Sequence, residues 1–160
     1  MDYLTISGKN YFGSYKYIRK ACRAFIIKDD MILTSYESKS SHYMLPGGGL
    51  EEGESDKECI IREVNEETGI IIEPLECLLQ LEELYEDTKY VSRYFTTRIV
   101  GKGNIKLTPQ EVEAGLEPRW LNIDEAIDIF SKHNSEPIEE WRGLYEREYF
   151  ALINCIDKIR

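Results

Sequence analysis

The chain has 160 residues, of which 42% are hydrophobic and 31% are charged, a composition typical of a globular protein rather than a disordered one. Its 30 acidic and 20 basic side chains give a formal net charge of −10, which argues against a protein that holds DNA or RNA through a broad basic surface. No apolar run approaches the roughly 18 residues of a membrane span. We therefore expect neither a nucleic acid polymer nor a membrane as a partner.

The N-terminus and the cysteines indicate a compartment. The first ten residues lack the basic start and apolar stretch of a secretory signal, which predicts a cytoplasmic protein. No repeat or linker interrupts the chain, so we expect residues 1–160 to form a single domain. The cysteines form no Cys-x-x-Cys pair, and we expect neither zinc nor disulfides at Cys22, Cys59, Cys77 and Cys155.

The sequence before residue 50 predicts short strands joined by turns. Asp29 and Asp30 separate two apolar runs, which we expect to form a β-hairpin. Residues 46–49, one proline and three glycines, favour turn geometry. The expected elements are strands at 20–28 and 31–36, a polar loop at 37–42 and a strand at 43–45.

A capped helix follows the glycines. Ser55 and Glu58 form a capping-box pattern, which places the beginning of a helix after Ser55. Gly69 is the residue type that commonly follows the end of a helix. We expect this helix to span about 56–68.

The rest of the chain predicts further strands and then helices. Runs rich in β-branched, aromatic and apolar residues are broken at Pro74, at 86–87 and at 101–103. Strands, a helix, strands and helices in this order indicate an α/β fold with helices on the faces of a mixed sheet. The expected strands are 70–72, 75–84, 89–100 and 119–123, and the expected helices are one from Asp124 to about His133 and one at about 138–159.

Three glutamates project from one side of the capped helix. At 100° per residue, Glu63, Glu66 and Glu67 fall within an arc of about 100°. Like charges this close destabilise a helix by several tenths of a kcal/mol per pair. The spacing alone allows either a solvated acidic face or a site for a hard cation such as Mg²⁺.

The surroundings of the glutamates favour a cation site. A Gly-rich segment precedes the helix, and Glu54 lies at its entrance. Arg62 is placed to pair with Glu66 four residues later and to hold its carboxylate in position. We expect these parts to form a compact, oxygen-lined site.

The same stretch resembles the Nudix box at every defined position, over 23 of the 160 residues. The resemblance implies the fold of the Nudix hydrolases, an α/β/α sandwich with a mixed β-sheet. The matching pattern is Gly48-x5-Glu54-x7-Arg62-Glu63-Val64-x-Glu66-Glu67-x-Gly69-Ile70.

The resemblance also implies metal-dependent hydrolysis of a diphosphate linkage in a nucleotide. The cofactor would be Mg²⁺ or Mn²⁺, which activates water, polarises phosphoryl oxygens and neutralises the leaving phosphate. The implied metal ligands are Glu63, Glu66, Glu67 and the backbone carbonyl of Gly47 or Gly48, with Glu54 as an outer member of the shell.

The general base stays open among several carboxylates. Glu63 or Glu66 could serve from within the helix, while Arg62 positions Glu66. A later loop commonly carries such a group in the family, and there we expect Glu113 ahead of Glu111. Solvated loop glutamates are the alternative for these two.

Basic residues outside the box are candidates for contacts with substrate phosphates. Arg23, Lys39 and Arg93 lie on or beside expected strands where a cleft could form. Ordinary surface charge is the alternative for each.

The substrate is not determined by the resemblance. Tyr85 stands where ADP-ribose pyrophosphatases have a proline, and Tyr85 and Tyr90 bracket, without matching, the tyrosine typical of dinucleoside polyphosphate hydrolases. By elimination we expect a nucleoside triphosphate, modified nucleotides included, with nucleoside diphosphate derivatives as runner-up. A catalytically silent domain that binds a nucleotide as a sensor is the alternative function, and a homodimer is left open.

Overall fold

The computed structural model describes residues 1–160, and none of its helices is long and apolar enough to cross a membrane. Nine strands, four α-helices and one 3-10 helix follow one another along the chain. The strands are β1 (Asp2–Ser7), β2 (Tyr17–Phe25), β3 (Ile27–Lys28), β4 (Met31–Glu37), β5 (His42–Met44), β6 (Gly47–Gly49), β7 (Ile70–Tyr85), β8 (Thr88–Lys102) and β9 (Leu116–Asn122). The helices are α1 (Asp56–Thr68), α2 (Pro109–Ala114), α3 (Ile123–Ser131), the 3-10 helix Lys132–Ser135 and α4 (Glu139–Ile159).

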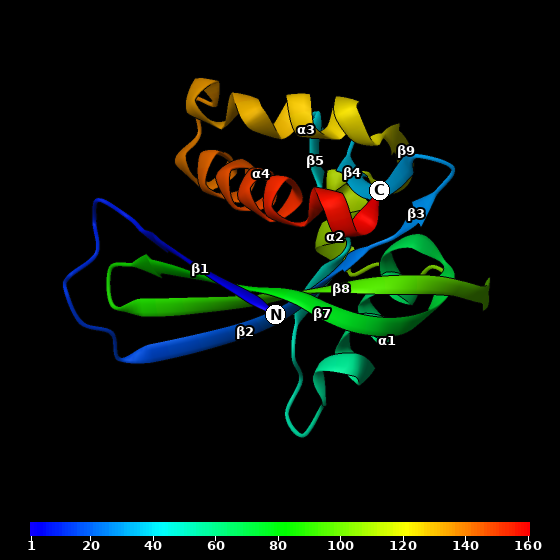
Figure 1. The fold of residues 1–160 in the computed structure, drawn as a ribbon, viewed down its shortest axis with the longest axis horizontal. Helices are drawn as coiled ribbons and strands as arrows, with labels where there is room; N and C mark the ends of the chain where they lie inside the picture. The colour runs from blue at the N-terminus through cyan, green and yellow to red at the C-terminus, as the bar shows by residue number, and fades with distance from the viewer.

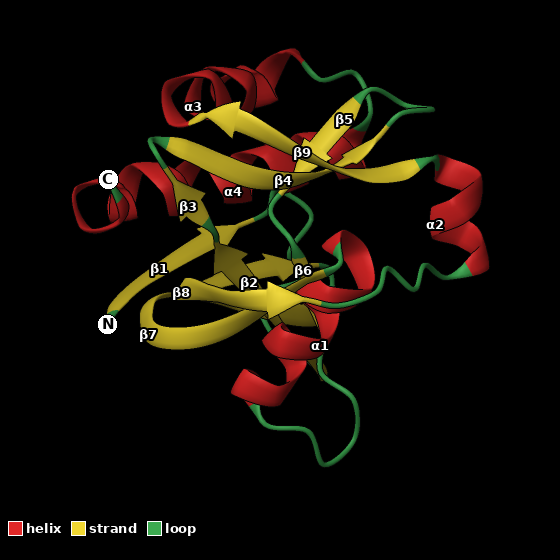
Figure 2. Ribbon diagram, turned by 90° about the vertical axis from the view of Figure 1, so that its right-hand side faces the viewer, coloured by secondary structure: helices red, strands yellow, loops and turns green.

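Two sheets lie between helices on opposite sides, with α3 and α4 on one side and α1 on the other (Figure 1). The larger sheet has the order β1-β7-β8-β2-β6, and the smaller one pairs β4 with β3, β5 and β9 (Figure 2). β1 runs parallel to β7 and β2 parallel to β8, whereas the other pairs are antiparallel. The predicted α/β/α sandwich with a mixed sheet is confirmed.

The two sides of the sheets bury separate apolar clusters. The larger cluster joins the sheets to α3 and α4 and includes Tyr94, Phe130 and Leu152. The smaller cluster contains Ile60 and Val64, which are fully buried on α1. Burial of apolar surface on both faces thus holds α1 in a fixed position against β2 and β7.

The predicted hairpin at 20–28 and 31–36 is wrong in its first strand. β2 belongs to the larger sheet and pairs with β8, and only Ile27–Lys28 pair with β4. The turn itself is confirmed, since Asp29 and Asp30 have φ values of 51° and 63°, as a tight hairpin turn requires. The apolar run is continuous because it crosses from one sheet to the other at the fully buried Ile26.

The three glycines do not form the predicted turn. Gly47–Gly49 form β6, which pairs antiparallel with β2. A Cβ atom at Gly47 would collide with the carbonyl oxygen of Cys22. The glycines are therefore needed for the close approach of two backbones rather than for a turn.

One predicted strand break and one predicted loop were also wrong. β7 continues through Pro74, where the pairing with β8 shifts register in a bulge instead of ending. The segment that carries Glu111 and Glu113 is the short helix α2 rather than a loop. Its beginning is marked by a capping box between Thr108 and Glu111, the same signal that identifies α1.

The helix that carries the box is confirmed at both ends. The Ser55 side chain accepts a hydrogen bond from the backbone of Glu58, and Gly69 adopts a φ of 72° after the last turn. The helix expected from Asp124 is α3, which begins one residue earlier, at Ile123, because Asn122 is its cap. The cysteines are free, as expected.

A buried carboxylate ties α4 to Leu45, two residues before the glycine strand. The fully buried Glu148 accepts hydrogen bonds from the backbone nitrogen of Leu45 at 2.7 Å and from the hydroxyl of Tyr94 at 2.6 Å. Burial works to raise the pKa of Glu148, but the charge of Arg147 and these hydrogen bonds keep it below its usual value. Glu148 is therefore an anion that fixes where β6 begins.

Candidate active site

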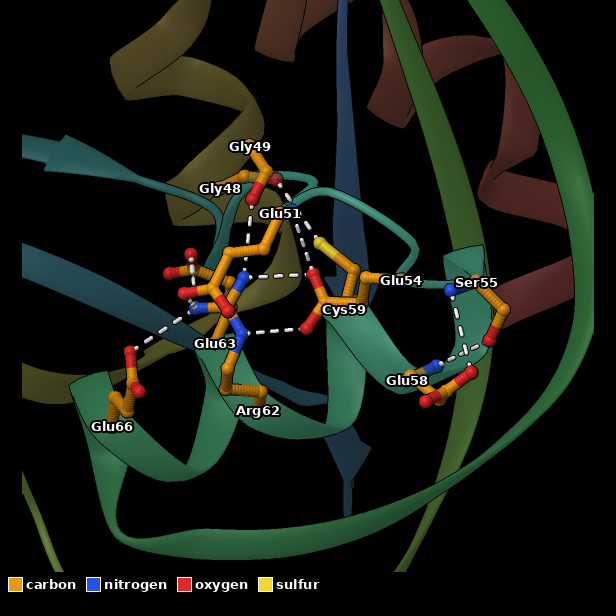
Figure 3. Close-up of polar contacts among 10 residues, drawn as sticks. All are labelled: Gly48, Gly49, Glu51, Glu54, Ser55, Glu58, Cys59, Arg62, Glu63 and Glu66. Carbon is orange, nitrogen blue, oxygen red and sulfur yellow. Dashed lines mark hydrogen bonds and ion pairs between the residues drawn. The ribbon is translucent and has the colours of Figure 1, made fainter.

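Arg62 lies at the centre of the site and holds the box carboxylates around its guanidinium (Figure 3). Its Nε and Nη2 donate to the two oxygens of Glu54 at 2.7 and 2.9 Å, a bidentate pair. Its Nη1 donates to Glu63 at 2.9 Å and, more weakly, to Glu66 at 3.3 Å. Nη2 also donates to the carbonyl of Gly49 at 3.1 Å, which links the helix to the glycine strand.

The bidentate pair defines the role of Glu54. The hydrogen bonds from Arg62 lower the pKa of Glu54 to about 2, and the same contacts raise the pKa of Arg62. Both carboxylate oxygens of Glu54 thus pair with Arg62, whereas the sequence predicted Glu54 as an outer ligand of the metal.

Glu63 lies against the backbone of Gly48. A Cβ atom at Gly48 would be 2.5 Å from the carboxylate carbon of Glu63, so a larger residue there would displace this carboxylate from its present position. Burial raises the pKa of Glu63, the charges of Glu66 and Glu111 add to the rise, and Arg62 opposes it. The carboxylate and the backbone of Gly48 therefore form one cluster of oxygen atoms.

Glu67 is the buried member of the cluster. Its carboxylate accepts a hydrogen bond of 2.7 Å from the hydroxyl of Ser35 on β4, and only 5% of the residue is exposed. Burial raises its pKa to about 8, and the charges of Glu63 and Glu111 contribute. In the metal-free protein this carboxyl group therefore holds a proton at neutral pH.

Carboxylate and carbonyl oxygens are suitable ligands for a hard divalent cation. In this structure, however, the carboxylates do not surround one common point. No group of three or more His, Cys, Asp or Glu side chains surrounds a point where a metal ion could be held. Arg62 engages Glu63 and Glu66, and Ser35 engages Glu67. Burial is the largest cause of the raised pKa values of Glu63 and Glu67, and a divalent cation would favour the ionised form of both.

The two candidate bases on α2 differ in position. Glu111 lies close enough to the cluster for its charge to act on Glu63 and Glu67. Glu113 points away into solvent and pairs with Lys39 at 3.7 Å, where both side chains are mostly exposed. The structure thus brings Glu111 toward the box and leaves Glu113 beside Lys39.

The three predicted phosphate-binding residues also lie in different surroundings. Arg23 lines a hollow beside Gly49, and its Nε is buried without a hydrogen-bond partner. Arg93 instead pairs with Asp56 at the beginning of α1 and with a side chain of the sheet. Lys39 is held by Glu113, so Arg23 alone of the three faces the hollow.

Several polar residues near the site were not predicted from the sequence. Ser35 gave no signal, because nothing in the sequence shows which strand faces the box. Glu148 gave a signal, because it stands in the apolar stripe of α4, four residues from Leu144 and four from Leu152. Arg147 is its neighbour in the sequence. A charged residue in such a stripe indicates a buried ion pair.

Known proteins match most of the chain. The family model of the NUDIX domain matches residues 18–141. RNA pyrophosphohydrolase from Dinoroseobacter shibae is 29% identical over 109 residues, which are 68% of this chain and 63% of that protein. Mouse diphosphoinositol polyphosphate phosphohydrolase 3-alpha is 28% identical over 117 residues, 72% of this chain and 70% of that protein. The chain thus spans less than two thirds of the bacterial relative and slightly more of the mouse one.

Solved structures share the fold. A NUDIX hydrolase from Nitrosomonas europaea superposes with a TM-score of 0.58 at 26% identity, over 85% of this chain and 90% of that one. A UDP-X diphosphatase superposes with a TM-score of 0.56 at 24% identity, over 69% of this chain and 54% of that one. The family match contains the whole box and the strands that position it, and the chain therefore belongs to the Nudix family.

Proposed function

We propose that this protein hydrolyses a diphosphate linkage in a nucleotide-type substrate with the help of a divalent metal ion. The observation that carries the proposal is the cluster around Arg62, in which box carboxylates from α1 meet the backbone of the glycine strand. A merely solvated acidic helix would need neither this guanidinium nor a glycine at Gly48. The intact set of glutamates also favours catalysis over the alternative of a silent nucleotide sensor.

The residues that would hold Mg²⁺ or Mn²⁺ are Glu63, Glu66, Glu67 and the carbonyl of Gly48. A bound divalent cation supplies charge for the phosphoryl oxygens and lowers the pKa of water. Arg62 orients Glu63 and Glu66 for this task, and Glu54 orients Arg62. Arg62 pairs with several carboxylates because one of them, Glu54, positions the guanidinium and the others, Glu63 and Glu66, are positioned by it.

Proton removal from the attacking water favours a carboxylate that is not paired with a cation. Glu63 and Glu66 contact Arg62 in this structure, whereas the carboxylate of Glu111 forms no ion pair and accepts a hydrogen bond from the backbone nitrogen of Thr108, the cap of its own helix. We therefore propose Glu111 as the general base, in place of Glu113. Arg23 would receive phosphate oxygens from the opposite side, through the unpartnered donor that it presents beside Gly49.

The substrate class proposed here is a nucleoside triphosphate or a nucleoside diphosphate derivative. The matching relatives are named for RNA and for diphosphoinositol polyphosphate, at identities of 29% and 28%. Such identities support the hydrolysis of phosphorus anhydrides but not one particular substrate.

Metal dependence follows directly from the oxygen cluster. We expect release of phosphate or of a nucleoside monophosphate from a nucleotide panel to require Mg²⁺ or Mn²⁺ and to stop when a chelator is added. The measurement is a colorimetric and chromatographic product assay with and without chelator. Full activity in excess chelator contradicts the proposal.

Arg62→Ala tests the orienting role of the guanidinium. We expect the variant to fold but to lose about 100-fold or more in turnover, because Glu63 and Glu66 lose the donor that holds them. Arg98→Ala is the matched control, since Arg98 forms an exposed pair with Glu73. Equal rates for both variants would show that Arg62 has no part in turnover.

Glu66→Gln and Glu67→Gln separate a metal site from an acidic surface. In saturating Mg²⁺ we expect each to lose about 100-fold or more in rate, roughly 3 kcal/mol of barrier, because a ligand is lost. In chelator Glu66→Gln removes a negative charge from a repelling cluster, and Glu67→Gln replaces a carboxyl group that is protonated at neutral pH with a neutral amide, so neither should be less stable than the parent. Glu52→Gln, at an exposed position before α1, serves as the control. Parental rates in both variants would refute the metal site.

The same Glu67→Gln variant has a pH signature in chelator. The pKa of Glu67 is raised from 4.5 to about 8 in the folded protein, so between these values the folded state keeps a proton that the unfolded state has lost. Stability of the parent should therefore fall as the pH rises from about 5 to about 8, and the variant should lack this part of the fall. Melting temperatures across this range test it.

A further inference from the structure

The basic hollow beside Gly49 continues into a second hollow farther along the sheet. The two have volumes of about 370 and 510 Å³, and Glu83, Tyr90 and Arg147 line both. We call the two together the trough, with a box end beside Gly49 and a far end under the first turns of α4. Residues from the beginning of α4 and from the turn between β7 and β8 line the far end. In Figure 1 this turn and the beginning of α4 lie at the same end of the molecule.

The charge of the trough reverses along its length. The box end is lined by Arg19, Lys20 and Arg23, all from β2. Besides the shared Glu83, the far end is lined by three glutamates, from the turn after β7 and from α4, and by two tyrosines. They are Glu86, which follows β7, Glu139 and Glu140 from the first turn of α4, and Tyr85 and Tyr90.

Arg147 lies on the floor between the two ends with an unused donor. It is nine-tenths buried, its Nε donates to Glu148 at 3.1 Å, and its Nη1 lies 3.8 Å from Glu83. Its Nη2 is buried and has no hydrogen-bond partner. Buried donors are almost always paired in native proteins, with protein groups or with ordered water, and Arg147 lines both hollows, so a water molecule or a polar ligand group in the trough would complete its hydrogen bonds.

Arg23 connects the trough to the box. Burial raises the pKa of Glu67 in the box and of Glu83 on the floor, and the charge of Arg23 opposes the rise in both. One guanidinium is therefore close enough to act on the box cluster and on the middle of the trough. A substrate with its phosphates at Arg23 would extend its remaining part toward the far end.

We propose that Glu86, Glu139 and Glu140 determine specificity by rejecting substrates that carry a further phosphate on the part of the molecule beyond the continuous phosphate chain. The box end receives the diphosphate, and the far end receives an uncharged or cationic group rich in hydrogen-bond donors, such as sugar hydroxyls. This rests on the proposed function. It also separates this protein from the substrates for which its matching relatives are named, since RNA and diphosphoinositol polyphosphates bring additional phosphates.

The rejection is expected to be local. Interactions between charges are screened over about 8 Å at physiological salt, so distant carboxylates contribute little and the glutamates of the trough contribute most. Each also lacks any basic partner within ion-pair distance, because the ion pairs of the protein include none of the three. Their charge is therefore available to repel an anion.

The probes are ADP-ribose and ADP-ribose 2′-phosphate, which share the scissile diphosphate and differ by one phosphate group. A second pair is dephospho-coenzyme A and coenzyme A. For each pair we would measure kcat and KM in Mg²⁺ and, independently of turnover, the rise in Tm that each probe causes. We expect kcat/KM to be about tenfold or more higher for the member of each pair that lacks the extra phosphate. That member should also cause the larger rise in Tm.

The variant is the double substitution Glu139→Gln and Glu140→Gln. It should reduce the preference about tenfold, mainly by lowering the KM of the phosphorylated probe. The control is Glu125→Gln with Asp157→Asn, which removes the same charge from exposed positions of α3 and α4 outside the trough. The control should keep the parental preference.

The outcomes separate the two proposals. If the probes are hydrolysed but neither pair shows a preference, or the double variant keeps the parental preference, the specificity proposal is overturned and the proposed function stands. If no nucleotide is hydrolysed with either metal, the proposed function fails, and the Tm measurements decide the specificity proposal. Equal rises in Tm within both pairs, the absence of any rise included, overturn it.

Discussion

The guanidinium of Arg62 is the positive charge that the box carboxylates share, and the site depends on it. It contacts Glu54, Glu63 and Glu66 and also the carbonyl of Gly49. Without it, one short helix would present several anions to one another beside a strand of glycines. The contact is strong at Glu54, where it is bidentate, and weak at Glu66, where the distance is 3.3 Å. Arg62 is thus held most firmly by Glu54 and contacts Glu66 most weakly.

The rest of the fold fixes the surfaces that this guanidinium joins. Apolar burial fixes α1, while Glu148 fixes the beginning of the glycine strand from the opposite side of the sheets. A buried anion of this kind depends on its partners, because removal of one partner leaves an uncompensated charge and destabilises the fold. The network of Glu148 and Arg147 therefore serves both the strand beside the box and the floor of the trough.

Local signals predicted the parts of the fold that local chemistry decides. The ends of α1 followed from Ser55 and Gly69, and the turn at Asp29 followed from its residue types. The glycine strand did not, because its pairing with β2 depends on distant contacts rather than on glycine propensity. The hairpin failed for the same reason, since an apolar run does not reveal that it changes sheets at Ile26. The box residues were recognisable from spacing, but Ser35, Glu111 and Arg147 reach the site only through tertiary folding.

The most direct test of this account is the position of the metal. Crystals grown with Mn²⁺ and a nucleotide whose diphosphate bridge is a methylene group would be examined by anomalous diffraction. The account predicts manganese within about 2.2 Å of oxygens from Glu63, Glu66 or Glu67 and from the analogue. Manganese bound only at other acidic residues, with the analogue away from the box, would contradict it.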